Sequence, residues 1–180
     1  MTRQQSLTEF LTAATSLCEG KTVWGTMPLQ LTYYLSKREP PLEYVSSVRA
    51  IVFREDSALV ITQENGEVYI LPGGRVEKGE KALETLKREI LEETGWALFK
   101  TKLLGGMHFH HLGLKPEGYA YPYPVFLWPI YIAEAKDFTA EAIIHDDWVS
   151  ESHFLPIDEV RKLTIRQGEL LLLETALELR

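Results

Sequence analysis

The chain has 180 residues, of which 45% are apolar, so it can bury a full core, and its length favours one domain with an extension. Its formal net charge of −7 argues against nonspecific nucleic-acid binding and against attraction to an anionic membrane, because such a surface repels phosphate. One cysteine, Cys18, excludes an internal disulfide and a thiolate metal cluster and suits a reducing cytosol. No long apolar run or signal segment is apparent, so we expect a soluble, cytoplasmic protein.

The first 43 residues are expected to hold a helix and a strand. Residues 6–9 (SLTE) resemble a capping box, and apolar residues continue the pattern as an amphipathic helix that ends near Gly20 and includes Cys18. A strand is expected near residues 29–35, before Pro40 and Pro41 interrupt the chain. Three roles remain open for this segment: dimerisation, covering a substrate, and simple packing against the core.

Two turns organise the next stretch. Residues 47–54 and 58–62 are short β-branched runs separated by a polar turn, which predicts a hairpin. A second turn at residues 63–67 contains an Asn-Gly pair and leads into a strand at residues 68–71. The paired glycines Gly73 and Gly74 follow, and they permit positive φ and a close backbone approach, so a main-chain carbonyl can point at a bound ion.

A helix after these glycines carries clustered acids. Apolar residues at helical spacing anchor one face on a sheet, and Gly95 closes the helix. Glu89, Glu92 and Glu93 lie three and four residues apart, so they repel one another on one face of the helix. A hard cation such as Mg²⁺ or Mn²⁺ would relieve that repulsion, and Arg88 can fix a neighbouring carboxylate.

The second half is rich in aromatic residues. A strand is expected at residues 98–104, interrupted by Gly105 and Gly106, and another at residues 125–132, which Pro129 places at an edge or bulge. Aromatic faces stack on nucleobases, so the loop at residues 118–123 is a candidate for binding a base. Simple packing of these rings remains the alternative.

Specific side chains can be named within this region. Tyr119 and Tyr121 are the candidate stacking residues, and His110 is a candidate substrate contact. In a strand His108 and His110 point one way and His111 the other, so a solvent-facing or substrate-contacting role is favoured over a soft-metal site. Further on, residues 165–179 predict a Leu-rich helix that packs on the sheet face opposite the acidic helix.

The acidic stretch resembles the Nudix box, G-x5-E-x7-R-E-U-x-E-E-x-G-U, where U is a bulky apolar residue. The matching residues are Gly74, Glu80, Arg88, Glu89, Ile90, Glu92, Glu93, Gly95 and Trp96. The one departure is Trp96, where an aliphatic residue is commoner. The resemblance implies an α/β/α sandwich around a mixed sheet, with a Nudix hydrolase domain at residues 44–180 after an N-terminal extension, helical or irregular, at residues 1–43.

The implied chemistry is metal-dependent pyrophosphohydrolysis of a nucleoside diphosphate linked to another group. The resemblance makes the carbonyl of Gly73 and the side chains of Glu89, Glu92 and Glu93 ligands of Mg²⁺ or Mn²⁺. One of these glutamates or an acid from the second half would be the general base. Arg88 and Glu80 would hold the loop and helix in place.

Several points stay open at this stage. The family often takes a further carboxylate from outside the box, for which Asp147 and Glu151 are candidates. No substrate subtype is identifiable, so the expected partner is a small nucleotide-type substrate, with a homodimer open. The alternative function is a catalytically silent nucleotide-sensing module, which loss of a box carboxylate would favour, and none is lost.

Overall fold

The computed structural model describes residues 2–144, 149 and 151–180. Its larger elements, in chain order, are α1 (Arg3–Ala13), β1 (Thr15–Trp24), β2 (Met27–Leu35), β3 (Arg49–Arg54), β4 (Ser57–Thr62), β5 (Val68–Tyr69), α2 (Ala82–Thr94), β6 (Trp96–His111), β7 (Val125–Phe138), β8 (Glu151–Pro156), α3 (Ile157–Val160) and α4 (Gln167–Leu179). Two short 3-10 segments, η1 (Leu42–Tyr44) and η2 (Ala140–Ala142), complete them. In the described part of the chain, no helix is long and apolar enough to cross a membrane.

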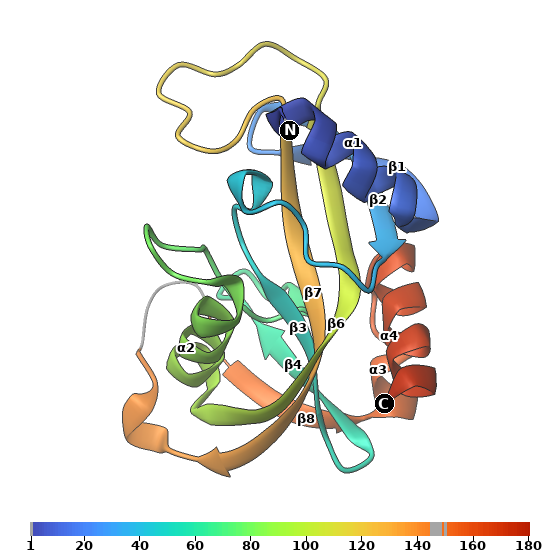
Figure 1. Ribbon diagram of the computed structural model, residues 1–180. Helices are drawn as coiled ribbons and strands as arrows, with labels where there is room; N and C mark the ends of the chain where they lie inside the picture. Colours follow the sequence, from blue (N-terminus) through green and yellow to red (C-terminus); the bar gives the residue numbers. More distant parts are fainter. Residues whose placement is uncertain (1, 145–148, 150) are drawn as a thin grey trace.

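The strands form one mixed sheet in the order β1-β2-β6-β7-β3-β4-β5, and β8 also pairs with β4. Neighbouring strands are antiparallel except β3 and β7, which run parallel. Figure 1 shows the sheet in the middle of the molecule, with α2 on one side and α4 on the other. The expected α/β/α sandwich around a mixed sheet is therefore confirmed.

Strand β3 shows why the two helices lie on opposite faces. Successive side chains of a strand point to opposite sides. Ala50 and Val52 pack in the same apolar cluster as Leu86 and Ile90 of α2. The alternate residues of β3, Ile51 and Phe53, belong to the other apolar cluster. That cluster also contains Leu172 and Leu173 of α4. This confirms the expectation that the C-terminal helix covers the face opposite the acidic helix.

The N-terminal helix is shorter than predicted. It begins one turn earlier, because Thr2 and Gln5 form the capping box, and it ends at Ala13 rather than near Gly20. Residues up to Trp24 form β1 instead, and Cys18 lies beside Tyr33 in the ladder with β2. Pairing with the next strand, in a hairpin, overrides the local helical pattern here. The predicted strand at residues 29–35 is confirmed as part of β2.

Strand β6 is also longer than predicted, because it continues through Gly105 and Gly106 to His111. A Cβ at Gly105 would overlap the carbonyl oxygen of Tyr34 in the adjacent strand, so the glycine allows close strand contact rather than ending the strand. Of the two settings predicted for Pro129, an edge or a bulge, the edge is excluded because β7 lies between β6 and β3, whereas the bulge agrees with the pairing. Its ladders are irregular there: β6 has a bulge next to it, and regular pairing with β3 begins only at Ile130.

Candidate active site

Helix α2 presents the acidic residues because its other face is buried. Leu86 and Ile90 are fully buried against the sheet, and Gly95 ends the helix in the left-handed conformation, with φ of 72°. At helical spacing, Glu89, Glu92 and Glu93 therefore lie away from the core and toward the loop that precedes the helix.

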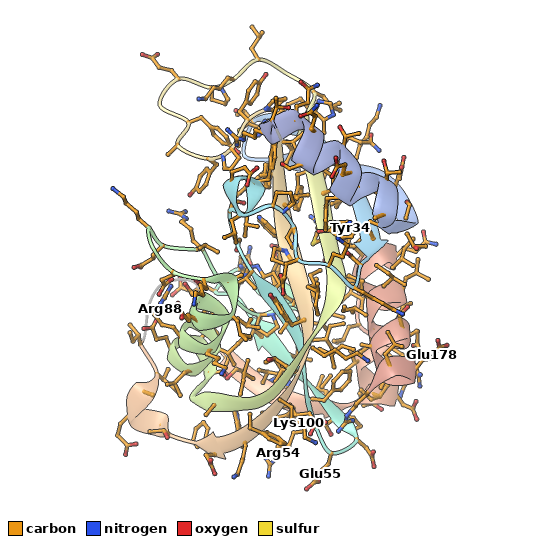
Figure 2. All side chains as sticks on the ribbon, in the orientation of Figure 1. Tyr34, Arg54, Glu55, Arg88, Lys100 and Glu178 are labelled. Atoms are coloured by element: carbon orange, nitrogen blue, oxygen red, sulfur yellow. The ribbon has the colours of Figure 1, made fainter. Side chains whose placement is uncertain are left out.

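Arg88 organises part of this acidic face. Its guanidinium donates two hydrogen bonds of 2.9 Å to the carboxylate of Glu80, and Thr85 donates a third of 2.8 Å to the same group. Nη1 of Arg88 also contacts Glu89 at 2.9 Å and Glu92 at 3.0 Å. The bonds from Arg88 and Thr85 lower the pKa of Glu80 to about 2, and the acids raise the pKa of Arg88. Figure 2 places Arg88 on the outer side of α2.

The glycine loop contacts the other two acids. The backbone N–H of Gly73 donates to Glu93 at 3.1 Å, and the Gly73 carbonyl accepts from the Arg49 guanidinium. A Cβ at Gly74 would overlap the carboxylate of Glu89, so the missing side chain makes room for that acid. Burial raises the pKa of Glu89, and Arg88 opposes that shift.

Arg49 is the second cation of the site, and it is the first residue of β3. Its guanidinium lies 4.9 Å from the ring centroid of Trp128. Burial lowers the pKa of Arg49, while the charges of Glu93 and Glu89 raise it. The partly buried guanidinium stays protonated, because the ordinary arginine pKa is far above neutrality.

Some of the oxygen atoms in this region are placed to coordinate a hard divalent cation. Glu89 and Glu93 line one cavity beside Gly73 and Gly74, and carboxylate oxygens are the ligands that Mg²⁺ and Mn²⁺ prefer. Glu92 is instead engaged by Arg88, and the Gly73 carbonyl by Arg49. Among the described residues, no three or more His, Cys, Asp or Glu side chains converge closely enough to hold an ion. All four predicted ligands therefore already have protein partners: Arg88 contacts Glu89 and Glu92, the Gly73 N–H donates to Glu93, and Arg49 donates to the Gly73 carbonyl.

The cavity has a volume of about 890 Å³ and reaches from α2 to the N-terminal end of α4. Residues of every strand from β1 to β7 contribute to its walls. Its aromatic lining consists of Trp24, Tyr69, Phe109, Tyr121 and Trp128. Its cationic lining consists of Arg49, Arg75 and Arg166. A cavity with acids at one end, cations and several flat rings suits a ligand that combines phosphates with an aromatic group.

The three predicted substrate residues occupy different places. Tyr121 lines the cavity, with its ring centroid 6.2 Å from that of Trp24 at an interplanar angle of 31°, and the Arg75 guanidinium lies 4.9 Å from the Tyr121 ring centroid. Tyr119 lies behind it, 5.3 Å from Tyr121 between ring centroids, and its hydroxyl hydrogen-bonds to His111 at 3.0 Å. His110 is exposed and is not among the residues that line this cavity in the described part of the chain.

One of the two acids predicted outside the box, Glu151, lies at a second cavity. Glu151 lines a hollow of about 530 Å³ together with Glu93, which therefore borders both cavities. Asp147 lies outside the described residues. Glu151 thus shares a cavity with one of the box glutamates, Glu93.

Sequence reasoning missed several residues that line the large cavity, among them Trp24, Arg49, Arg75 and Glu169. Arg49 left a signal, because it is a cation directly before the apolar run of residues 50–53 in β3. Trp24 left no signal, since its contact with the cavity depends on how β1 and β2 join the sheet.

Comparison with known proteins identifies the same family as the sequence motif on α2. A family model described as NUDIX domain matches residues 43–174. A putative ADP-ribose pyrophosphatase, YjhB, from Bacillus subtilis (strain 168) is 34% identical over 82 residues, which are 46% of this chain and 39% of the relative. A putative 8-oxo-dGTP diphosphatase from the same organism is 43% identical over 54 residues, which are 29% of this chain and 36% of the relative. The chain thus aligns with less than half of the length of either curated relative.

Solved structures share the fold. The Bacillus subtilis pyrophosphohydrolase BsRppH superposes with a TM-score of 0.62 at 22% identity, covering 90% of this chain and 97% of that one. A NUDIX hydrolase from Nitrosomonas europaea gives a TM-score of 0.55 at 21% identity, covering 73% of this chain and 87% of that one. With the family model spanning most of the sequence, this chain belongs to the NUDIX domain family.

Proposed function

We propose that this protein is a metal-dependent pyrophosphohydrolase that cleaves a phosphoanhydride bond in a nucleoside diphosphate linked to another group. The observation that carries the proposal is the single cavity in which Glu89 and Glu93 meet the Gly73-Gly74 loop, two arginines and an aromatic wall. The two curated relatives carry names of enzymes that cleave diphosphate bonds in nucleotides, which supports the same reaction class.

The box residues would hold the cation. Glu89 and Glu93 are its proposed ligands from the cavity wall, and Glu92 and the Gly73 carbonyl would join them on release from Arg88 and Arg49. A bound Mg²⁺ or Mn²⁺ neutralises phosphate charge and acidifies a water molecule. One of the box glutamates, or an acid outside the box, would act as the general base that accepts a proton from the attacking water.

The arginines of the cavity would hold the phosphates. Arg49 and Arg75 both line the cavity near the glycine loop and offer planar sets of donors that match phosphate oxygens. Arg88 and Glu80 act on the other side as positioning residues, because they bind each other and two of the box acids.

Recognition of the nucleoside is proposed for the aromatic wall. Tyr121 with Trp24 would stack on the base, and Tyr119 would support Tyr121 from behind. Stacking of this kind contributes about 1–3 kcal/mol per base. A contact from His110, a homodimer and a cytoplasmic location stay predictions.

The decisive experiment is a substrate panel with products identified by mass. The panel contains nucleoside triphosphates, ADP-ribose, dinucleoside polyphosphates, NADH, nucleotide sugars and capped RNA, each with Mg²⁺ or Mn²⁺. We expect hydrolysis of at least one class at a phosphoanhydride bond, and loss of that activity in excess chelator. Full turnover in chelator, with no metal retained by elemental analysis, would contradict the metal requirement. Nucleotide binding with no turnover of any member would instead favour the silent sensor.

A further inference from the structure

Two buried polar side chains line the cavity away from the acidic helix. Gln63 follows β4 and is 8% exposed, and Glu169 lies in the first turn of α4 and is 6% exposed. Both belong to the lining of the large cavity. Within the described ranges, neither side chain forms a hydrogen bond or an ion pair with a protein group. Their polar atoms are not among the described atoms that are fully buried without a partner, so they reach the open space of the cavity, where a ligand can supply hydrogen-bond partners.

The surroundings of Glu169 favour a ligand with donor groups. Arg166, at the start of α4, lies close enough for its charge to lower the pKa of Glu169, whereas burial raises it. Arg166 itself reaches Thr22 of β1 at 3.4 Å, and the Tyr69 hydroxyl donates to Glu67 at 2.5 Å. The neighbouring polar groups thus have other contacts, and the Glu169 carboxylate offers two acceptor oxygens to the cavity.

The shape and lining of the cavity restrict the kind of donor. Its volume of about 890 Å³ is in the range of small-molecule sites and can admit a whole nucleotide. Flat rings of Trp24, Phe109 and Trp128 line the same space, so a planar heterocycle is favoured over an aliphatic amine. One carboxylate and one amide in the lining then select the edge of the base by its pattern of hydrogen-bond donors and acceptors.

We propose that Glu169 and Gln63 form a base-recognition subsite for a guanine-type edge, an inference that rests on the proposed hydrolysis of a nucleotide derivative. The ring N–H and the adjacent amino group of guanine donate in parallel to the two carboxylate oxygens of Glu169. The amide NH₂ of Gln63 donates to the neighbouring carbonyl oxygen of the base. Adenine fits less well, because it places a ring nitrogen lone pair against a carboxylate oxygen.

The test measures the affinity of the full chain for GMP, IMP and AMP by calorimetry in the presence of Mg²⁺. IMP keeps the ring N–H and carbonyl of guanine but lacks its amino group. We expect the wild type to bind GMP more tightly than IMP, and IMP more tightly than AMP. Glu169→Gln replaces one acceptor by a donor, so it should weaken GMP binding about tenfold or more, which corresponds to about 1.4 kcal/mol, and shrink the preference over AMP.

Two further variants make the result specific. Glu178→Gln is the matched control, because Glu178 lies on the same helix, is exposed, and is seen in Figure 2 at the outer side of α4. It should bind all three nucleotides as the wild type does. Gln63→Leu should weaken GMP and IMP alike, since both share the carbonyl group that Gln63 would contact. This second variant keeps the test valid if Glu169→Gln fails to fold.

Measuring the hydrolysis of guanine- and adenine-containing substrates of the panel, in the wild type and in both variants, distinguishes failure of the base subsite from failure of the proposed enzyme. If the protein hydrolyses the panel and both variants keep the wild-type ranking of bases, the subsite is overturned and the enzyme stands. If nothing is hydrolysed but the GMP preference is lost in Glu169→Gln, the subsite stands and the enzyme fails. Equal affinity of the wild type for GMP and AMP also overturns the subsite.

Discussion

Two arginines balance the acids of the box from opposite sides. Arg88 binds Glu80, Glu89 and Glu92 from within the helix, whereas Arg49 reaches the Gly73 carbonyl from the sheet. The self-repulsion that the sequence predicts is therefore already reduced by fixed cations. We infer that a divalent ion has to compete with both arginines for part of its predicted ligand set.

Glu93→Gln separates charge from shape at this site. Glutamine keeps an oxygen that can accept from the Gly73 N–H, but it binds a hard cation more weakly than a carboxylate does. Turnover should fall by roughly 10²-fold or more, because metal-assisted effects are worth several kcal/mol. The measurements are the turnover rate and the Mg²⁺ affinity by calorimetry. Glu84→Gln, an exposed change on the same helix, is the control, and a wild-type rate in Glu93→Gln would contradict the site assignment.

At the scale of elements, the position of α4 depends on one close contact. Gly168 lies in the first turn of the helix, and a Cβ there would overlap the ring of Tyr33 in β2. The glycine thus lets the helix approach the strand, and the next residue in the chain is Glu169, which lines the cavity. Helix packing and the cavity wall are therefore coupled through this contact.

Gly168→Ala should lower the free energy of unfolding by about 1–3 kcal/mol, because the added methyl group forces the helix or the ring to move. Urea unfolding of the variant and the wild type measures the difference. Gly20→Ala is the matched control, since no atom lies within 4 Å of a Cβ built at that position. Equal unfolding free energies for wild type and Gly168→Ala would show that the contact is not close in solution.

At the scale of the whole molecule, the N-terminal hairpin belongs to the same sheet and the same core as the rest of the chain. β2 pairs with β6, and Leu29, Leu31 and Tyr33 lie in one apolar cluster with residues of α4. β1 brings Trp24 to the cavity wall. We infer that residues 1–43 complete the substrate cavity, and the boundary before residue 44 remains a prediction about where the family core begins.

The pH dependence of stability is a further property of the whole fold. Burial, with a smaller effect of His110, lowers the pKa of His108 to about 4, below the ordinary histidine value of 6.5. From pH 6.5 down to about 4 the unfolded chain takes up a proton that the folded chain resists, so stability falls as the pH falls. The lowered pKa of His111 acts in the same direction. Between pH 4.5 and about 2, the lowered pKa of Glu80 adds a further loss.

Urea unfolding at pH 7 and pH 5 tests this expectation. The upper limit for one histidine is about 1.4 kcal/mol per pH unit, and the partial exposure of His108 reduces it. His108→Gln cannot titrate, so its stability should fall less between the two pH values than that of the wild type. Parallel losses in both proteins would mean that His108 is not the group responsible.

Local sequence patterns determined many of the secondary-structure elements of this protein. The hairpin of β3 and β4, the turn before β5, the amphipathic helix α2 and its end at Gly95 each depend on residues close together in the chain, so they could be predicted from the sequence. The acidic face of α2 follows from helical spacing alone. These elements already contain the box residues on which the family resemblance rests.

Tertiary structure decided what lies around the box. β6 passes through two glycines because it gains hydrogen bonds from β2, which is distant in sequence, and β1 replaces a predicted helical turn because it forms a hairpin with β2. Arg49, Trp24 and Glu169 come from three separate regions and meet in one cavity only when the sheet curls and α4 packs on it. Sequence spacing carries no information on such contacts, since they depend on strand order and register rather than on local periodicity.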